Sequence, residues 1–470
     1  MRMLIGGTWV EGSDAIPVHD PYTNEEVDTV PRGTAADVDR ALAAALEGYG
    51  VNRRLSTGER ARILLRAAEL VEARQEELAV TIAREGSKTI REARKEAYRC
   101  TRTLRIAGEE ATRIHGETIA FDQQKGSEGR RGYFFRQPIG VVAAITPFND
   151  PLNLVAHKVG PAIAGGNAVV VKPATVTPLS ALKLAGILQE AGLPPGVLNV
   201  VTGPGSELGQ ALAGDSRVRM VSFTGGVAAG LEVARAAGLK KLGMELGSNS
   251  PVLVLDDCDL EAAVESCVSG AFWAAGQNCI GVQRLYVQRG IFEAFRETFV
   301  ARTLRYKVGP KLDEDCDMGP LITEVESRRV EAWVAEALAG GATLECGHRR
   351  RGAVYWPTVL TGVPDGARVE CDEVFGPVVS LWPIRDLDEG IARANAVDFG
   401  LHAAVFTGSL ASAMRAVEEL EAGGVMVNDS TDYRMDAMPF GGIKGSGLGR
   451  EGIRFAVQEM TEPKTVCFNL

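Results

Sequence analysis

A cysteine at position 279 stands between two glycines in the segment GQNCIG, residues 276–281. Glycines permit a tight backbone and the close approach of a ligand, so this cysteine can present its sulfur to a cleft. The reactive form is the thiolate, and a covalent nucleophile therefore needs surroundings that lower its thiol pKa. The competing interpretation is a buried structural cysteine, which is the commoner role for a cysteine taken alone.

Two other segments carry groups that suit the same chemistry. Glu245 precedes the glycine-containing turn of MELGSNSP, where a carboxylate at a domain junction can act as a general base on water. Asn149 lies between the two prolines of ITPFNDP, and its amide can donate to a developing oxyanion. The alternatives are a solvated glutamate and a turn asparagine that bonds its own backbone.

Two segments suggest a dinucleotide site, although no GxGxxG follows a first strand. FTGG, residues 223–226, ends a predicted strand and opens a helix, whose free N–H groups suit a pyrophosphate. VKPAT, residues 171–175, ends the strand NAVVV and places Lys172 at the carboxyl edge of a sheet, where such folds bind ligands. Taken singly, each signal is weak.

The elements that position these residues alternate between helix and strand. Residues 59–115 have the apolar periodicity of helices. Residues 139–225 alternate short Val- and Ile-rich runs with helical stretches, and the pattern restarts after residue 250. Buried strands alternating with helices predict an α/β fold with parallel sheets and a second α/β domain.

Two polar segments stand apart from this pattern. Residues 121–137, FDQQKGSEGRRGYFFRQ, can form a protruding hairpin, and the final TEPKTVCFNL can form an edge strand that needs a partner. Both hint at oligomerisation.

Composition excludes several classes of protein. The 470 residues carry a formal net charge of -10, which disfavours nonspecific binding to nucleic acid or to an anionic membrane. The eight cysteines show no CxxC spacing, so no metal site is expected, and their scatter fits reduced thiols. With no signal peptide and no apolar run of membrane-spanning length, a cytoplasmic location is the expectation.

Together the segments resemble the aldehyde dehydrogenase superfamily. PFNDP, VVVKPA, FTGG, MELGSNSP, GQNCIGVQR, EVFGPV and MPFGGIKGSGLGREG occur in family order over essentially the whole chain. The resemblance implies a Rossmann-like NAD(P)-binding domain, an α/β catalytic domain and a small β oligomerisation hairpin. The corresponding residues are 1–118 with 139–247, then 248–447, then 119–138 with 456–470. A homodimer or homotetramer is expected.

The resemblance also implies roles for individual residues. Cys279 is expected to be the nucleophile, Glu245 the base that activates the deacylating water, and Asn149 with the Cys279 backbone N–H the oxyanion hole. Lys172 is expected to contact the adenosine ribose, and Glu373 the nicotinamide ribose with Phe375 beside it. The remaining cofactor contacts implied are Ile145, Thr146, Pro147, Phe148, Thr175, Gly205, Gly209, Phe223, Thr224, Gly225, Gly226 and Leu246.

Some positions depart from the family pattern. Thr175 stands where NAD-preferring members often carry a glutamate that repels a 2′-phosphate, so NADP is expected to be tolerated, with NAD not excluded. Gly226 replaces the usual serine and removes one hydroxyl contact to the pyrophosphate. Phe148 replaces a common tryptophan, a mild change.

The substrate is expected to be a short aldehyde with an anionic or polar tail. The loop of residues 428–440 lines the substrate mouth in the family, and it looks closest to the lactaldehyde and phosphonoacetaldehyde group; phosphoglyceraldehyde enzymes have similar loops. Arg434 can pair with a carboxylate, phosphate or phosphonate, or make a structural salt bridge with Asp432 or Asp436. The other candidate substrate contacts are Arg99, Arg102, Asn278 and Phe440.

Two rival functions are compatible with the sequence. One is a CoA-acylating aldehyde dehydrogenase, although such relatives typically lack the glutamate equivalent to Glu245. The other is a noncatalytic binding or structural protein on the same scaffold, against which the joint presence of Cys279, Glu245, Asn149 and Lys172 argues.

Overall fold

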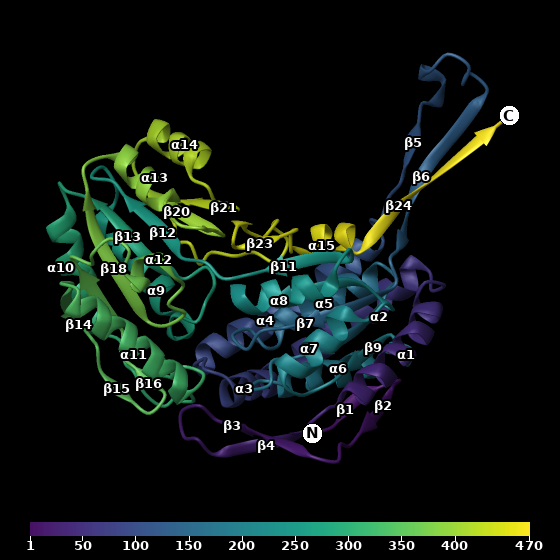
Figure 1. Ribbon diagram of the computed structural model, residues 1–470, viewed down its shortest axis with the longest axis horizontal. Helices are drawn as coiled ribbons and strands as arrows, with labels where there is room; N and C mark the ends of the chain where they lie inside the picture. The colour runs from purple at the N-terminus through teal and green to yellow at the C-terminus, as the bar shows by residue number, and fades with distance from the viewer.

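The computed structural model describes residues 1–470 and contains two large β-sheets, one on each side of the molecule (Figure 1). The first has eight strands in the order β2-β1-β9-β8-β7-β10-β11-β23. The five central strands, β9, β8, β7, β10 and β11, run parallel to one another. At the two ends of this parallel set, β1 pairs antiparallel with β9 and β23 pairs antiparallel with β11. The strands are β1 (Met3–Ile5), β2 (Thr8–Val10), β7 (Val141–Ile145), β8 (Ala168–Lys172), β9 (Leu198–Val200), β10 (Val218–Thr224), β11 (Lys241–Glu245) and β23 (Gly447–Leu448).

Helices cover both faces of this sheet because its strands are apolar on both sides. Along β7, Val142 and Ala144 pack into one core with α2 to α6, while Val141 and Ala143 pack into another with α1, α7 and α8. The helices are α1 (Ala35–Asn52), α2 (Thr57–Ala73), α3 (Gln75–Glu85), α4 (Ile90–Ala111), α5 (Asn153–Ala164), α6 (Leu179–Glu190), α7 (Gly205–Gly214), α8 (Val227–Ala237) and α15 (Ile453–Glu459).

The segment predicted as helical, residues 59–115, forms the three helices α2, α3 and α4. Both α2 and α4 begin with a capping box, in which the N-cap hydroxyl accepts from the backbone of the third helical residue, a glutamate whose carboxylate accepts in return. The pairs are Ser56 with Glu59 and Thr89 with Glu92. These boxes fix where each helix starts.

The second sheet has seven strands in the order β14-β17-β18-β13-β12-β20-β21, all parallel except β14. The predicted α/β fold class, with a restart of the pattern after residue 250, is confirmed. Its strands are β12 (Ser250–Val254), β13 (Val282–Gln288), β14 (Thr343–Cys346), β17 (Thr358–Thr361), β18 (Val378–Ile384), β20 (His402–Phe406) and β21 (Gly424–Val427). The accompanying helices are α9 (Leu260–Phe272), η2 (Trp273–Gly276), α10 (Phe292–Thr303), α11 (Glu324–Ala339), α12 (Arg368–Cys371), α13 (Leu387–Asn395) and α14 (Leu410–Glu419).

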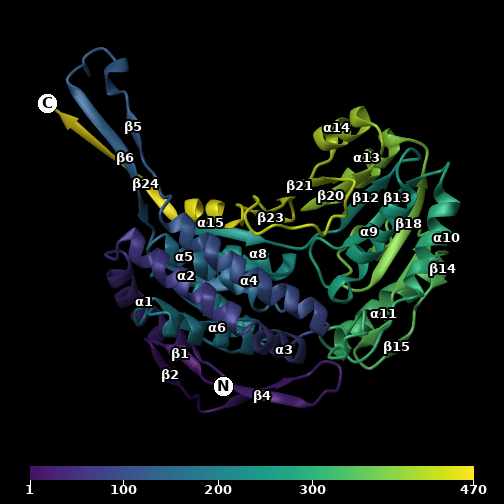
Figure 2. The ribbon, with the colours of Figure 1, turned by 180° about the vertical axis from the view of Figure 1, so that it is seen from behind.

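A three-stranded arm projects from the first sheet's side of the molecule (Figure 2). It contains β5 (Glu117–Ile119), η1 (Phe121–Gln123), β6 (Arg130–Pro138) and the C-terminal β24 (Thr461–Asn469). The final strand, predicted to seek a partner, pairs antiparallel with β6 of its own chain over nine residue pairs and leaves its other edge open.

The two sides of the molecule are tied together at several points. The chain returns from the second sheet to the first, where β23 pairs with β11. A ribbon of β3 (Ala15–His19) and β4 (Glu26–Pro31) runs beneath both sides, and Asp20 at its turn forms a buried ion pair with Lys311 at 2.9 Å. The small pairs β15 (Arg350–Arg351) with β16 (Val354–Tyr355), and β19 (Phe399–Gly400) with β22 (Ile443–Lys444), complete the fold. None of the helices has the length and apolar character that crossing a membrane requires.

Candidate active site

A cavity of about 410 Å³ is lined by residues from both sides of the molecule. Its walls come from α4, from the turn after β7, from the loop between η2 and β13, and from the segment after β21. The sequence therefore brings together groups that lie more than 300 residues apart. The lining residues are Lys88, Lys95, Arg99, Asn149, Asp150, Leu154, Trp273, Ala274, Gln277, Asn278, Cys279, Ile280, Asp429, Asp432, Tyr433 and Arg434.

Cys279 lies in the loop between η2 and β13 and lines this cavity while remaining partly exposed. Burial of the sulfur raises the pKa of the Cys279 thiol to about 12, and the positive charge of Arg434 lowers that pKa. The side chain packs against a small apolar cluster of Ile280, Leu401 and Phe440. The resting form is thus a neutral thiol with one nearby cation that favours the thiolate.

Asn149 lines the same cavity from the turn that follows β7. Its neighbour Asp150 is fixed by two cations: Lys88 donates to one carboxylate oxygen, and Arg99 to the other at 3.2 Å. These ion pairs hold the turn beside the cavity. The structure therefore brings together the predicted nucleophile and the predicted oxyanion donor.

Glu245 is the last residue of β11 and is almost fully buried. Burial and the neighbouring Glu451 raise the pKa of its carboxyl group well above the ordinary value, and one of its oxygens has no hydrogen-bond partner. Glu451 stays ionised, because Lys158 and Arg434 hold its pKa at about 2 despite its burial. Glu245 is absent from the lining of the main cavity and instead borders a water-sized cavity of about 20 Å³.

Arg434 and Arg99 both line the main cavity, and both are also paired within the chain. Arg434 donates to Glu451 at 3.0 Å and lies 3.7 Å above the Phe440 ring. The alternative predicted for Arg434, a salt bridge with Asp432 or Asp436, is therefore wrong about the partner: the carboxylate comes from Glu451, in the segment before α15. The Nε atoms of Arg99 and Arg434 are buried without a hydrogen-bond partner, so each guanidinium retains a free donor.

The remaining predicted substrate contacts differ in position. Asn278 lines the cavity and accepts a hydrogen bond from the Ile280 backbone at 3.3 Å. Phe440 is fully buried and does not line the cavity; it packs behind Cys279 and beneath Arg434. Arg102 is exposed on α4 and is absent from the lining.

Polar groups gather at the carboxyl ends of β7, β8 and β10 in the first sheet. Lys172 is buried, donates to the Pro173 carbonyl at 2.7 Å and has its pKa lowered to about 8 by burial. The hydroxyls of Thr146 and Thr224 are buried without a partner. Buried polar atoms are normally satisfied, so these orphan groups fit a polar ligand such as a dinucleotide.

Glycines leave space beside these groups. Helix α8 starts after Gly226 without a side-chain cap, so no cap side chain accepts from its first N–H groups, and a Cβ on Gly226 would meet nothing within 4 Å. Gly205 opens α7 close to Lys172, and Thr175 donates to the Gly203 carbonyl at 3.0 Å. Ile145 lies beside Gly209, and Phe223 lies beside Gly225. The Leu246 N–H donates to the Ser446 carbonyl. The remaining predicted cofactor residue here is Pro147, which follows β7.

Glu373 and Phe375 reach this edge from the second side of the molecule. Glu373 accepts from the Ser248 backbone at 2.9 Å, and burial raises its pKa to about 7. The rings of Phe375 and Phe148 meet edge-on with centroids 5.7 Å apart. The residues that could hold a cofactor therefore come from both sides of the molecule, as do the residues that line the cavity.

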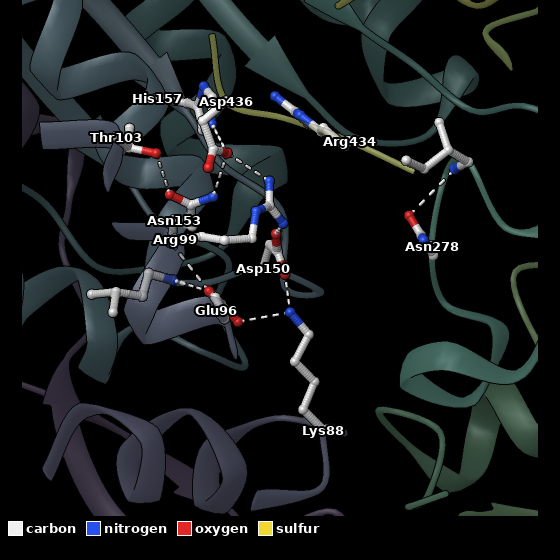
Figure 3. A network of polar contacts seen from close by, with 12 residues as sticks. Lys88, Glu96, Arg99, Thr103, Asp150, Asn153, His157, Asn278, Arg434 and Asp436 are labelled. Atoms are coloured by element: carbon white, nitrogen blue, oxygen red, sulfur yellow. Dashed lines mark hydrogen bonds and ion pairs between the residues drawn. The ribbon is translucent and has the colours of Figure 1, made fainter. Parts of the chain in front are cut away.

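Sequence reasoning missed a network of buried ions behind the cavity wall (Figure 3). Asp436 accepts from Arg99 at 2.8 Å and from His157 at 2.9 Å, and these partners hold its pKa well below the ordinary value despite its burial. Lys88 pairs with Glu96 at 2.7 Å. The sequence did contain one indication of this network: Lys158 is the only lysine, arginine or acidic residue in the apolar helix NLVAHKVGPAIA. A lysine is almost never buried unless it is paired, so a buried acidic partner could have been predicted.

A model of the aldehyde dehydrogenase family matches residues 9–466. An aspartate-semialdehyde dehydrogenase of Pseudomonas canavaninivorans is 52% identical, covering 97% of each chain. A 3-sulfolactaldehyde dehydrogenase of Priestia aryabhattai is 45% identical over 100% of this chain and 98% of its own. The crystal structure of NADP-dependent glyceraldehyde-3-phosphate dehydrogenase from Bacillus halodurans, complexed with NADP, superposes with a TM-score of 0.97 at 35% identity, covering 100% of this chain and 99% of the other.

Proposed function

Because the chain belongs to the aldehyde dehydrogenase family, we propose that Cys279 is its covalent nucleophile, assisted by Asn149 and Glu245. The chain is an NAD- or NADP-dependent enzyme that oxidises a small polar aldehyde. The observation that carries the proposal is that Cys279 and Asn149 line one cavity together with cationic side chains, among them Arg99 and Arg434.

The first half of the proposed reaction forms a thioester. The Cys279 thiol first loses its proton to solvent water; the resulting thiolate forms a C–S bond with the aldehyde carbon, and the carbonyl electron pair moves to oxygen. The Asn149 amide and the Cys279 backbone N–H donate hydrogen bonds to that oxyanion. Bound NAD or NADP supplies a hydride acceptor, which brings the former aldehyde carbon to the oxidation level of an acid.

The second half releases the acid. Glu245 accepts a proton from water as the water oxygen bonds to the thioester carbon, and the C–S bond then breaks to return the sulfur of Cys279. Burial and the neighbouring Glu451 raise the pKa of Glu245 well above the ordinary value, which makes its carboxylate a stronger base toward water.

The cofactor is proposed to lie across the carboxyl edge of the first sheet. Lys172 has N–H donors left for ribose hydroxyls, and the uncapped start of α8 offers N–H groups to the pyrophosphate. Glu373 would accept from the other ribose with Phe375 packed beside it. Thr175 carries no charge, so a 2′-phosphate meets no repulsion there, and both cofactors are expected to be used.

The tail of the aldehyde is proposed to be anionic or strongly polar: a carboxylate, sulfonate, phosphate or phosphonate. Support comes from the Arg99 and Arg434 side chains, which line the cavity, and from the names of relatives that act on 3-sulfolactaldehyde and aspartate semialdehyde. Lys95 adds an exposed cation on the cavity wall, stacked on Trp273 at 4.7 Å. Asn278 is proposed to contact the substrate directly, and Phe440 to act from behind Arg434.

The domain division inferred from the sequence is retained as part of this proposal. Residues 1–118 with 139–247 would hold the cofactor, residues 248–447 would carry the nucleophile, and the arm of residues 119–138 and 456–470 would join subunits into a dimer or tetramer. A cytoplasmic location likewise stays a prediction.

A panel of aldehydes tests the proposal. Short aldehydes with carboxylate, sulfonate, phosphate, phosphonate and hydroxyl tails, and a neutral control such as propanal, are assayed with NAD and with NADP. The expected result is the highest kcat/KM for an anionic aldehyde, with no added CoA. A CoA requirement would favour the acylating alternative, and a lack of reduced cofactor across the panel would favour the noncatalytic one.

A further inference from the structure

The turn directly before Cys279 has an unusual backbone. Ala274 and Ala275 adopt left-handed conformations, with φ values of 49° and 56°, and Gly276 follows with φ of 69°. A left-handed conformation is costly for a residue that has a Cβ, and two such residues in succession persist only when the surrounding structure holds them. Residues 274–276 form this turn, the nucleophile turn.

Hydrogen bonds from several elements hold the nucleophile turn. The Ala274 N–H donates to one carboxylate oxygen of Glu92 at 2.8 Å. The Ala274 backbone carbonyl accepts from the Gln277 side-chain amide at 3.0 Å, and the side-chain oxygen Oε1 of Gln277 accepts from the Ile322 N–H at 2.8 Å. Ala274, Glu92 and Gln277 are all buried, so water does not compete for these bonds.

The carboxylate of Glu92 also belongs to the start of α4. Its second oxygen accepts from the Thr89 N–H at 2.8 Å and closes the capping box of that helix. One buried carboxylate therefore joins the helix that lines the cavity on the first side to the turn that precedes the nucleophile on the second side. Its two oxygens each accept from a different backbone donor, so removing the carboxylate breaks both bonds and shortening it leaves only one of them within reach.

We propose that Glu92 is a positioning residue for Cys279: by binding the Ala274 N–H, it keeps the nucleophile turn left-handed and aims the Cys279 sulfur into the cavity. The inference rests on the proposed role of Cys279 as the nucleophile. Without this bond the two alanines relax toward right-handed backbone, which re-aims the following residues, and a displacement of about 1 Å from the reactive geometry is enough to cost roughly 100-fold in rate.

The competing explanation is that Glu92 only caps α4, and the chain itself provides the means to separate the two. In α1, Asp37 occupies the same third helical position and closes a capping box with Thr34. Its carboxylate accepts a hydrogen bond from the Thr34 N–H at 2.8 Å. An aspartate can therefore cap a helix here. Glu92→Asp keeps the charge and the cap but is one methylene too short to retain both bonds. Glu59→Asp in α2 is the matched control, because Glu59 caps its helix with no contact to the nucleophile turn.

The experiment measures the single-turnover burst of reduced cofactor, which reports attack by Cys279 and hydride loss, together with the Kd for the cofactor and the Tm. Glu92→Asp is expected to slow the burst by roughly 10- to 100-fold with an unchanged cofactor Kd, while Glu59→Asp leaves the burst at the wild-type rate. Equal burst rates in the two variants would overturn the inference.

A second substitution distinguishes positioning from a general loss of structure. Ala274→Gly allows the left-handed conformation without the cost of a Cβ, so in the Glu92→Asp background it should recover part of the lost burst rate. No recovery would overturn the inference, whatever the Tm of the variant. If the wild-type protein itself formed no acyl group on Cys279, the proposed function would fail, whereas normal acylation in Glu92→Asp would reject only the role of Glu92.

Discussion

The cofactor edge of the first sheet and the substrate end of the cavity are built on opposite principles. At the cofactor edge, the Thr146 and Thr224 hydroxyls are buried without partners, and α8 starts without a cap. At the substrate end, by contrast, Arg99 and Arg434 are each already paired with carboxylates. One site therefore leaves its donors open for a ligand, and the other keeps its cations within ion pairs and exposes only part of each guanidinium.

This difference indicates how each site selects its ligand. Open backbone and hydroxyl donors suit a ligand that every member of the family shares, and glycines provide the room for it. Cations already paired with carboxylates remain charged while buried, and their net attraction for an anion is moderated by those partners. Selection of a tail therefore depends on the guanidinium donors of Arg99 and Arg434 that their carboxylate partners leave free at the cavity, and not on net positive charge.

The largest effect is expected at the substrate end. Arg434→Gln should raise KM for an anionic aldehyde by roughly 10- to 100-fold, because a hydrogen bond to a charged group contributes about 1.5–3 kcal/mol, and it should affect a neutral aldehyde far less. Steady-state kinetics with both aldehydes measure this. Arg296→Gln is the control, since Arg296 pairs with Glu345 but does not line the cavity. Equal effects on the two aldehydes would assign Arg434 a purely structural role.

A smaller effect is expected at the cofactor edge. Thr175→Glu should raise KM for NADP relative to that for NAD by roughly tenfold, because a carboxylate beside the adenosine ribose repels a 2′-phosphate. Thr175→Gln has nearly the same size without the charge and should leave the ratio unchanged. Strict rejection of NADP by the wild-type protein, or the same ratio in both variants, would place the 2′-phosphate elsewhere.

The smallest effect joins the two regions through Glu245. Glu451→Gln removes a negative charge whose presence raises the pKa of Glu245, so the acid limb of the kcat profile should move to lower pH. Arg434→Gln removes a cation that lowers the same pKa and should move that limb to higher pH. The pH dependence of kcat measures both, and shifts in the same direction would contradict the electrostatic account.

Much of the cofactor edge could be predicted because its parts are local in sequence. FTGG and VKPAT each join a strand end to the turn that follows, so spacing alone places Gly226 and Lys172 at a sheet edge. The α/β class followed in the same way from alternating apolar runs. The break of residues 59–115 into three helices was missed, although Thr89 and Glu92 have the spacing of a capping box.

The substrate end could not be predicted to the same extent, because its contacts join distant segments. Arg434 pairs with Glu451 and not with Asp432 or Asp436, and nothing local marks Glu451 as the partner. The bond between Glu92 and Ala274 spans 182 residues and depends on how two sheets pack. The type of a residue indicated its chemistry, but only the packing of the fold determines which charge it meets.

The most direct test of the central claim uses Glu245→Gln, which should form the thioester but fail to hydrolyse it. With an anionic aldehyde and NAD or NADP, the expected result is a burst of about one equivalent of reduced cofactor per active site, followed by a stall. Mass spectrometry should find the acyl group on the peptide that contains Cys279. A burst with the acyl group on another residue, or steady turnover without a stall, would contradict the account.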